Sequence, residues 1–539
     1  MKVYLVNPRY PDTFWGFRHV NDLNGMQYCI ANLSVPTVAA LTPADVEVEI
    51  CDENVEAVDF ETDAEIIGLT SFNIQSNRAF EIAAEFRKRG KLVVMGGPYA
   101  TLVPQHCRDH VDVLFVGEAE LTWPRFLQEY RAGTYSNLYE QVEKVDIKDT
   151  PIPRWDLMKI DRYGSVGVQT TRGCPFNCEF CDIIVMLGRK VRTKTVEQVM
   201  AELRFLQPLL ERAGREDIFF TDDNFIGNKK FAKELLKEII SFNNSLSRKI
   251  HFMTELTITL ANDEDLLDLL VQANFTRVFV GIESPRTESL NEVAKVQNTR
   301  WDMERSIEKI QSHGIFIWAG MIVGFDHDDV HVFREMFDFI QKNKIIGSIT
   351  GPLSAPINTP LWQRLREEGR LIDDTWSDHG STNIIPKNMT RQQLYAGYHW
   401  IMAEQYTYEN YTQRLLGMID LLPADRPVRT RGLPTWKQVK TLLKTLRYYA
   451  LTTDWRRQRM FWKVIVACLR RKPAYLDEVL SHVIVHKHMY RHTERLTEGF
   501  VVANPADVAD VGHTPAAREA QHVPRAVDRA EEVWVRAAS

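Results

Sequence analysis

The chain has 539 residues, more than one ordinary hydrophobic core accommodates, so two or three packed domains are expected. Hydrophobic residues make up 44% and charged residues 26% of the chain, as in a typical globular protein, which excludes a fibrous or wholly disordered one. The formal net charge of −6 gives no reason to expect nucleic acid as a partner.

The seven cysteines are too few for a disulfide framework, and three of them, Cys174, Cys178 and Cys181, fall within eight residues. Metal ligation is therefore favoured over bridging. The N-terminal run MKVYLVNPRYP lacks the continuous apolar segment of a secretion signal. Because no run of about 18 apolar residues is present, a membrane span is not expected, and a reducing cytoplasm is the predicted location.

Residues 1–140 alternate short apolar runs with amphipathic stretches, which predicts a parallel sheet with helices between its strands. The predicted strands are residues 2–6, 46–50, 65–70, 91–97 and 111–117. Several of them end in polar or glycine-containing turns, at 71–73, 96–98 and 117–118. Ligands lie at the carboxyl ends of such strands, so the turns together favour a binding domain, although for any single turn a purely structural role of glycine is the simpler explanation.

After a polar connection with Pro151 and Pro153, the alternation of strand and helix resumes. Strands are predicted at residues 165–173, 217–224, 251–256, 277–284, 315–325 and 348–356, with amphipathic helices at 195–212, 228–242 and 301–313. This pattern predicts a full or partial β/α barrel, in which the chemistry lies on the loops that follow the strands.

From about residue 375 the strand pattern fades, and helical, aromatic-rich sequence takes over. Residues 437–472 hold eleven Lys/Arg and one acidic residue, interleaved with Trp455, Phe461 and Trp462. This stretch either lies on an anionic membrane surface or forms a solvated helical face that packs its aromatic rings on the barrel. Residues 501–539 lack a helical apolar face and are expected to form a disordered tail.

The strongest motif is Cys174-Pro-Phe-Asn-Cys178-Glu-Phe-Cys181, directly after a predicted strand. Three thiolates on one short loop select zinc or an iron–sulfur cluster. A zinc site usually needs a second Cys/His pair, and none is close in sequence. Three ligands on a 4Fe-4S cluster leave one iron open for substrate. The alternative of three buried structural cysteines is disfavoured, because it would require this spacing to arise by chance.

This C-x3-C-x2-C spacing after a barrel strand resembles the signature of the radical SAM superfamily, over roughly residues 150–370. The resemblance implies that the open iron binds S-adenosylmethionine (SAM), which is cleaved reductively to a 5′-deoxyadenosyl radical. It also implies SAM contacts from residues that match later strand ends. These are Phe180, Asp222, Asp223, Asn224, Glu255, Gly281, Glu283, Ser284, Gly320 and Gly324. Core packing of Phe180 and helix capping by the aspartates are the structural alternatives.

A Rossmann-like sheet that precedes such a barrel resembles the cobalamin-binding radical SAM class. The resemblance implies cobalamin contacts from three loops. These contacts are Ser71, Phe72, Asn73, Gly96, Gly97, Pro98, Tyr99, Gly117 and Glu118. No Asp-x-His-x-x-Gly motif is present, which implies cobalamin bound without a protein imidazole, or a domain that has lost it. His19, His106 and His110 are lone histidines, which are more often surface or core residues than ligands.

Residues 397–419 and the opening residues 1–17 resemble a subgroup that includes the hopanoid C-2 methylases. The domains expected are a cobalamin-binding Rossmann-like domain (1–140), a partial (β/α)6 radical SAM barrel (150–370) and a mainly helical C-terminal extension (375–500). The function implied is C-methylation of an unactivated carbon through methylcobalamin, and the resemblance suggests a hopanoid-like lipid as the substrate. The alternatives are a cobalamin-dependent radical cyclase or oxidoreductase, and a non-catalytic corrinoid sensor. An electron donor such as a flavodoxin or ferredoxin is an expected partner. If residues 437–472 lie on a membrane surface, they make the protein peripheral to the inner face of the membrane.

Overall fold

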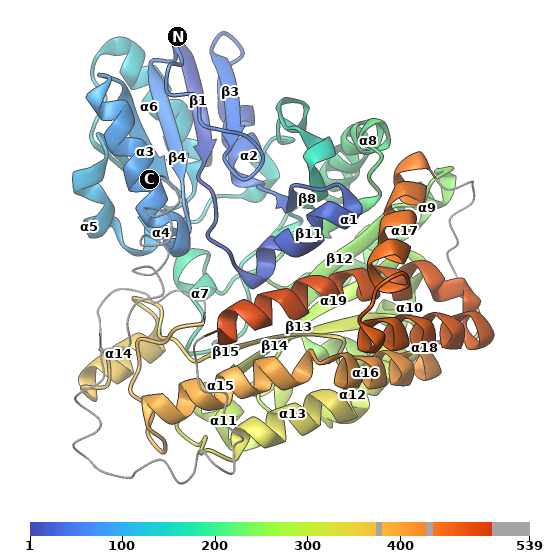
Figure 1. Cartoon of the computed structure of the whole chain (residues 1–539). Coiled ribbons are helices and arrows are strands. Elements are labelled where there is room, and N and C mark those ends of the chain that lie inside the picture. Colours follow the sequence, from blue (N-terminus) through green and yellow to red (C-terminus); the bar gives the residue numbers. More distant parts are fainter. Residues whose placement is uncertain (373–379, 427–434, 499–539) are drawn as a thin grey trace.

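Figure 1 shows the computed structural model of the chain, which describes residues 1–372, 380–426 and 435–498. The tail at 501–539, for which disorder was expected, lies outside the described residues, as does the start of the helical extension at 375–379. The described chain forms two parallel sheets and a set of C-terminal helices.

The first sheet has six parallel strands in the order β3-β1-β4-β5-β6-β7. Their bounds are β1 Lys2–Asn7, β3 Glu47–Asp52, β4 Ile66–Thr70, β5 Leu92–Gly96, β6 Val113–Val116 and β7 Leu138–Glu140. Strands buried on both faces need apolar residues throughout, and IIGLT and LVVMG supply them. Helix α3 (Ser76–Lys88) covers one face, and α2 (Ser34–Leu41) and α6 (Ala119–Ala132) cover the other. The predicted α/β sheet and its five strands are confirmed, and the short strand β7 is an addition.

The second sheet has seven parallel strands in the order β15-β14-β13-β12-β11-β8-β2. Six of them are β8 Tyr163–Val168, β11 Asp217–Phe220, β12 His251–Leu256, β13 Phe275–Glu283, β14 Phe316–Val323 and β15 Gly347–Pro352. Helices α8 (Val196–Ala213), α9 (Lys229–Ser245), α10 (Glu264–Gln272), α12 (Met303–Ser312) and α13 (Val332–Lys342) connect them. Within the described ranges the two outermost strands, β15 and β2, do not pair. The predicted partial barrel of six strands is therefore confirmed.

The seventh strand, β2 (Tyr28–Ala31), comes from the N-terminal region and pairs with β8. The chain leaves the first sheet after β1, crosses to the barrel through residues 8–27, adds β2 and then returns through α2. Residues 1–140 therefore contribute to both sheets. We call residues 8–33 the crossover segment.

The C-terminal helices pack along the barrel (Figure 1). They are α15 (Arg391–Gln405), α16 (Tyr408–Leu421), α17 (Trp436–Tyr449), α18 (Trp455–Arg471) and α19 (Leu476–Thr497). Their buried side chains, such as Tyr398, Met418 and Val464, join one hydrophobic core with the barrel strands. None of the helices in the described ranges is long and apolar enough to span a bilayer.

Candidate functional site

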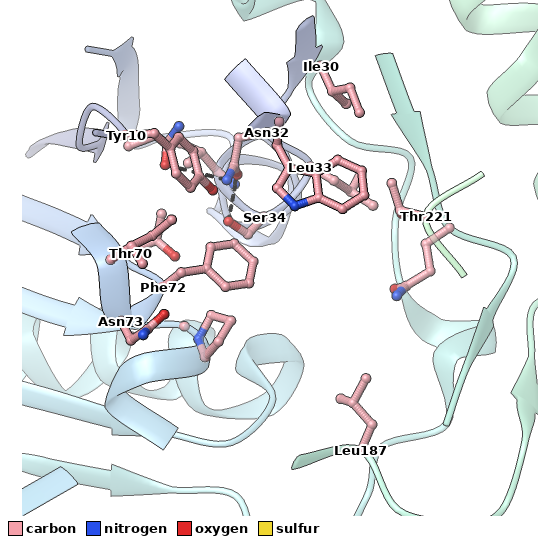
Figure 2. Close-up of a pocket in the computed structure, with 18 of the residues that line it drawn as sticks. Tyr10, Ile30, Asn32, Leu33, Ser34, Thr70, Phe72, Asn73, Leu187 and Thr221 are labelled. Atoms are coloured by element: carbon pink, nitrogen blue, oxygen red, sulfur yellow. Dashed lines mark hydrogen bonds between the residues drawn. The ribbon is translucent and has the colours of Figure 1, made fainter. Parts of the chain in front are cut away.

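The carboxyl ends of both sheets border one cavity of about 1060 Å³. Strands β4 to β6 and the loops after them line one side, and strands β11 to β15 line the other. Figure 2 shows Phe72, Asn73 and Tyr10 on one side of this space and Thr221 and Leu187 across from them. The cavity is thus shared by the two predicted binding regions.

The cysteine loop follows β9 (Thr171–Arg172) and begins at Gly173, whose φ of +90° favours glycine. Cys178 is buried, and Cys174 and Cys181 are half-buried. Burial raises the pKa of the Cys174 and Cys181 thiols. Burial thus favours the protonated thiols, whereas a bound metal centre favours the thiolates because thiolate is the form that binds metal.

The donor set fits a cluster better than a single ion. No three His, Cys, Asp or Glu side chains in the described residues gather into a site for one metal ion. A 4Fe-4S cluster instead takes each thiolate on a separate iron, so its ligands need not meet at one point. Three soft thiols on one buried loop match that requirement.

Two residues that the sequence did not single out lie beside the cysteine loop. The Gln297 side-chain amide donates a hydrogen bond of 3.5 Å to the Cys178 sulfur. Lys295 lies over the Phe180 ring at 5.7 Å and donates to Glu283 at 2.6 Å. Although burial lowers the pKa of Lys295, the Glu283 carboxylate and the Cys178 thiol raise it above its ordinary value. A buried positive charge therefore lies beside the cysteine loop, close to its sulfurs.

The predicted carboxylates at the end of β11 fix the cysteine loop. Asp222 accepts hydrogen bonds from the backbone N–H groups of Thr170 (2.6 Å) and Thr171 (3.0 Å). Asp223 accepts one from the N–H of Gly173 at 2.8 Å. Burial raises the pKa of both carboxyls to about 6. These aspartates orient the backbone that leads into Cys174.

The residues for which SAM contacts were expected divide into two groups. Phe180, Glu255, Gly281, Glu283 and Gly320 line the cavity. Asp222, Asp223, Asn224, Ser284 and Gly324 are not among its lining residues. The Ser284 hydroxyl accepts from the N–H of Arg286 at 3.1 Å. Burial, with the Asp223 and Asp222 carboxylates, raises the pKa of Glu255 to about 7.

The loops of the first sheet approach the cavity closely. Of the residues expected to contact cobalamin, Phe72, Asn73, Gly96, Gly97, Pro98, Gly117 and Glu118 line it, whereas Ser71 and Tyr99 do not. A Cβ atom on Gly97 (φ +94°) would lie 2.5 Å from the Thr70 hydroxyl oxygen, and one on Gly117 (φ +89°) would lie 2.5 Å from the Gln141 carbonyl oxygen. Both turns therefore require glycine.

Below these loops the cavity continues between the first sheet and two helices. Its walls there are Leu5, Gly68, Val94 and Phe115 from the strands, Val35, Val38 and Leu41 from α2, and Ala119 and Trp123 from α6. No histidine is among the cavity residues of the described chain, so His19, His106 and His110 all lie outside its lining. An apolar channel beneath glycine turns, with no imidazole among its described lining residues, fits a large group with an apolar tail. The sequence did not indicate this channel.

An ion cluster joins the first sheet to the cysteine loop. Glu118 accepts from Arg172 and Arg192, each at 2.8 Å, and from the N–H of Val145 at 3.1 Å. Burial raises the pKa of Glu118, but the two guanidinium groups outweigh it and hold the pKa below its ordinary value. Arg172 lies in β9 and Arg192 in β10 (Arg192–Thr193), the antiparallel pair that precedes and follows the cysteines. Sequence reasoning missed this pairing because the partners are distant along the chain.

The crossover segment supplies an aromatic wall. Tyr10 stacks on Tyr28 with ring centroids 5.7 Å apart, and Trp15 packs on Phe279 of β13 at 5.4 Å. All four side chains line the cavity. This wall was also missed, because residues 8–33 show neither helical nor strand periodicity.

Two family models match the chain: the radical SAM superfamily over residues 168–340, and a domain of unknown function, DUF4070, over residues 359–500. The chain is 34% identical to an uncharacterized methyltransferase, sll1242, of Synechocystis sp., over 92% of each chain. It is 28% identical to the hopanoid C-2 methylase of Rhodopseudomonas palustris, over 77% of this chain and 78% of that one.

Two solved structures share the fold. One is OxsB, a cobalamin-dependent SAM radical enzyme with aqua-cobalamin and SAM bound (TM-score 0.59, 15% identity, 96% of this chain and 82% of that one). The other is the radical SAM methyltransferase TsrM from Kitasatospora setae, with cobalamin and a [4Fe-4S] cluster bound (TM-score 0.57, 19% identity, 86% of this chain and 99% of that one).

Proposed function

The chain belongs to the radical SAM enzymes, with methyltransferase relatives, and we propose that it binds cobalamin and methylates an unactivated carbon of an apolar substrate. The observation that carries this proposal is the single cavity shared by the cysteine-bearing barrel and the glycine turns of the first sheet. The proposed reaction requires two cofactors and a substrate to lie next to one another, and a cavity bordered by both binding regions allows this.

We assign the cofactors to the residues that fit them. Cys174, Cys178 and Cys181 would hold the 4Fe-4S cluster, and Phe180, Glu255, Gly281, Glu283 and Gly320 would border SAM. Cobalamin would occupy the glycine turns and the apolar channel between the first sheet, α2 and α6. When bound, these groups supply reductive cleavage of SAM and a methyl donor.

The protein's own contribution is position and exclusion. Asp222 and Asp223 fix the backbone before the cysteines, and Glu118 ties that backbone to the first sheet. The aromatic and aliphatic walls exclude water and stray hydrogen donors from a radical reaction. Rigid support of this kind keeps the reacting groups aligned.

We propose a lipid-like, hopanoid-type substrate because the cavity wall is built from flat apolar side chains. The Tyr10–Tyr28 stack and the Trp15–Phe279 pair offer surfaces for a rigid ring system. We further propose that a flavodoxin or ferredoxin reduces the cluster and that the protein works in the cytoplasm, at the face of a membrane.

The test is anaerobic reconstitution with iron, sulfide and cobalamin, followed by mass spectrometry after addition of SAM, a reductant and a hopanoid. We expect 5′-deoxyadenosine, S-adenosylhomocysteine and a product heavier by one methylene. Deoxyadenosine without S-adenosylhomocysteine would instead support a cyclase or oxidoreductase. Cys178→Ala should abolish cluster content and SAM cleavage, whereas Cys29→Ala, a half-buried cysteine outside the loop, should retain both.

A further inference from the structure

Helix α18 exposes large apolar side chains on its outer face. Trp455 is 59%, Trp462 47% and Leu469 50% exposed. With Arg459 and Val466 they are spaced by four, three, four and three residues, which places all five on one stripe of the helix. A solvated helix carries polar residues on such a stripe, so these side chains need another explanation.

The inner face of α18 already anchors the helix. Phe461, Val464, Ile465 and Cys468 are buried in the core shared with the barrel. Of the two interpretations open from the sequence, packing of the aromatic rings on the barrel therefore holds for Phe461. Trp455 and Trp462 face outward and contribute little to that core.

Basic side chains lie within the exposed stripe and beside it. Arg456, Arg459, Lys463 and Arg470 are exposed, and the only carboxylate between residues 437 and 472 is Asp454. No ion pair joins Arg459, Lys463 or Arg470 to another described residue. Their charge is therefore free to act on a partner outside the molecule.

The same composition continues in α17 and the loop after it. Trp436 is 71%, Leu443 56% and Leu451 80% exposed, and Lys440 and Arg447 occupy positions between them. In α17, residues 436, 440, 443 and 447 share one stripe by the same spacing. Two neighbouring helices thus present tryptophan, leucine and basic side chains outward.

We propose that the outward faces of α17 and α18 are the surface by which this protein lies on an anionic bilayer. Tryptophan prefers the headgroup level of a bilayer, leucine enters the acyl boundary, and lysine and arginine attract anionic lipid. The inference deepens the proposed function by naming the membrane-contact surface, and it rests on that function only in the choice of a lipid phase as the partner.

A protein electron donor is a poorer fit for this surface. An electron carrier must approach the cluster, and the cysteine loop leads directly into α7 (Ile183–Met186). In Figure 1, α7 lies beside the first sheet, whereas α18 lies at the right-hand end of the barrel. The two regions are on different sides of the molecule.

Flotation of the full-length protein on vesicles tests the proposal. The probes are phosphatidylcholine vesicles with and without phosphatidylglycerol. The aromatic variant is Trp455→Ser/Trp462→Ser, and its control is Trp301→Ser, which removes a tryptophan that is 56% exposed and lies outside α17 and α18. The charge variant is R456Q/R459Q/K463Q/R470Q. Its control, R87Q/K88Q/R125Q/R131Q, removes four exposed cations from the helices of the first sheet.

We expect the wild type and both controls to bind vesicles that contain phosphatidylglycerol. The partition coefficient should fall about tenfold in the charge variant and fall clearly in the aromatic variant. Unchanged melting temperatures would show that the variants are folded. Methylation of detergent-dispersed substrate should persist in both variants. If no protein, including the wild type, methylates the substrate while the flotation results are as expected, only the proposed function is contradicted.

Three outcomes would overturn the surface assignment. They are absence of wild-type flotation, equal loss in variants and controls, and a wild-type dimer that dissociates in the aromatic variant, which would assign the face to a second copy. If wild-type flotation is absent, capture of an acidic flavodoxin by the wild type but not by the charge variant would assign the face to an electron donor instead.

Discussion

Glu255 places a carboxyl group in a mostly apolar cavity wall, and no side chain in the described residues hydrogen-bonds to that carboxyl group. Burial and the nearby Asp223 and Asp222 carboxylates raise its pKa from 4.5 to about 7. The folded chain therefore binds this proton more tightly than the unfolded chain does. Stability from this group is full below pH 4.5 and is lost as pH rises through about 7, at ~1.4 kcal/mol per unit of pKa shift.

Glu255→Gln should accordingly raise the apparent Tm of the cofactor-free protein at pH 8 and leave it unchanged at pH 4. The stability contributed by Asp222 and Asp223 also falls as pH rises in both proteins, so the Tm difference between the proteins reports Glu255 together with its repulsion from these two carboxylates. Scanning fluorimetry across this pH range measures the effect, with the exposed Glu140→Gln as control. A Tm difference that is independent of pH would contradict the assignment.

Gln297 is a positioning residue for the cluster because its amide donates to the Cys178 sulfur. Hydrogen bonds to thiolate sulfur stabilise the reduced, more negative cluster. Gln297→Leu should therefore lower the cluster midpoint potential by tens of millivolts while iron content stays near the wild-type level. A redox titration followed by electron paramagnetic resonance measures this shift.

The matched control is Gln311→Leu, another buried glutamine, which donates to the Asn343 and Lys344 carbonyls far from the cysteine loop in sequence. It should leave the potential unchanged. An equal shift in both variants would mean that Gln297 acts only through general stability.

At the scale of elements, α19 holds the crossover segment in place. The His488 ring nitrogen Nε2 donates to the Phe14 carbonyl at 2.7 Å, Lys487 pairs with Asp22 at 2.6 Å, and Arg495 pairs with Asp12 at 3.0 Å. Burial lowers the pKa of His488 to about 3, so the ring is neutral at physiological pH. The aromatic wall of the cavity thus depends on a helix from the other end of the chain.

His488→Ala should loosen residues 8–33 and weaken substrate binding more than it weakens the fold. The lost buried hydrogen bond is worth about 1 kcal/mol, and the space left by the ring adds to that cost. Hydrogen–deuterium exchange should show faster exchange in the crossover segment. His327→Ala, at an exposed histidine, serves as control. Unchanged exchange in His488→Ala would refute the claim that α19 holds the crossover segment in place.

The elements that the sequence predicted are those with a local signal. Periodic apolar runs located the strands of both sheets, and the cysteine spacing located the loop. The crossover segment, β2 and β10 escaped prediction because they are short and take their positions from partners far along the chain, 474 residues in the case of Phe14 and His488. The predicted strand at 165–173 is divided into β8 and β9, and the pairing of β9 with β10 was not predicted. The sequence predicted that Asp222 and Glu255 lie at strand ends, because this depends on local pattern. It did not predict that Asp222 braces the cysteine loop while Glu255 faces the cavity, because these roles depend on distant partners.

At the scale of the whole molecule, the two sheets meet across a ligand space and a set of braces. These include the Glu118–Arg172–Arg192 cluster and a buried hydrogen bond of 2.8 Å from the Tyr163 hydroxyl to Asp52. The cysteine loop and the glycine turns then belong to different sheets with separate cores. Damage to one binding region should therefore leave the other intact.

Gly97→Ala tests this separation. The new Cβ would meet the Thr70 hydroxyl at 2.5 Å and the Ser71 nitrogen at 3.3 Å, at a φ of +94° that disfavours alanine. We expect the Kd for cobalamin to rise about tenfold or more, equal to ~1.4 kcal/mol, while iron and sulfide content remain unchanged. Spectroscopic titration with cobalamin and iron analysis of the same preparations measure both quantities.

The control for backbone strain alone is Gly133→Ala, because Gly133 has a φ of +70° but a Cβ atom added there would have no neighbour within 4 Å. Strain of this kind costs about 1–2 kcal/mol of stability, so Gly133→Ala should melt earlier yet bind cobalamin normally. If both glycine variants lose cobalamin equally, the binding defect follows from general weakening of the first sheet. If Gly97→Ala also loses its iron, the two binding regions fold as one unit, because damage at the glycine turn then reaches the cysteine loop through the braces between the sheets.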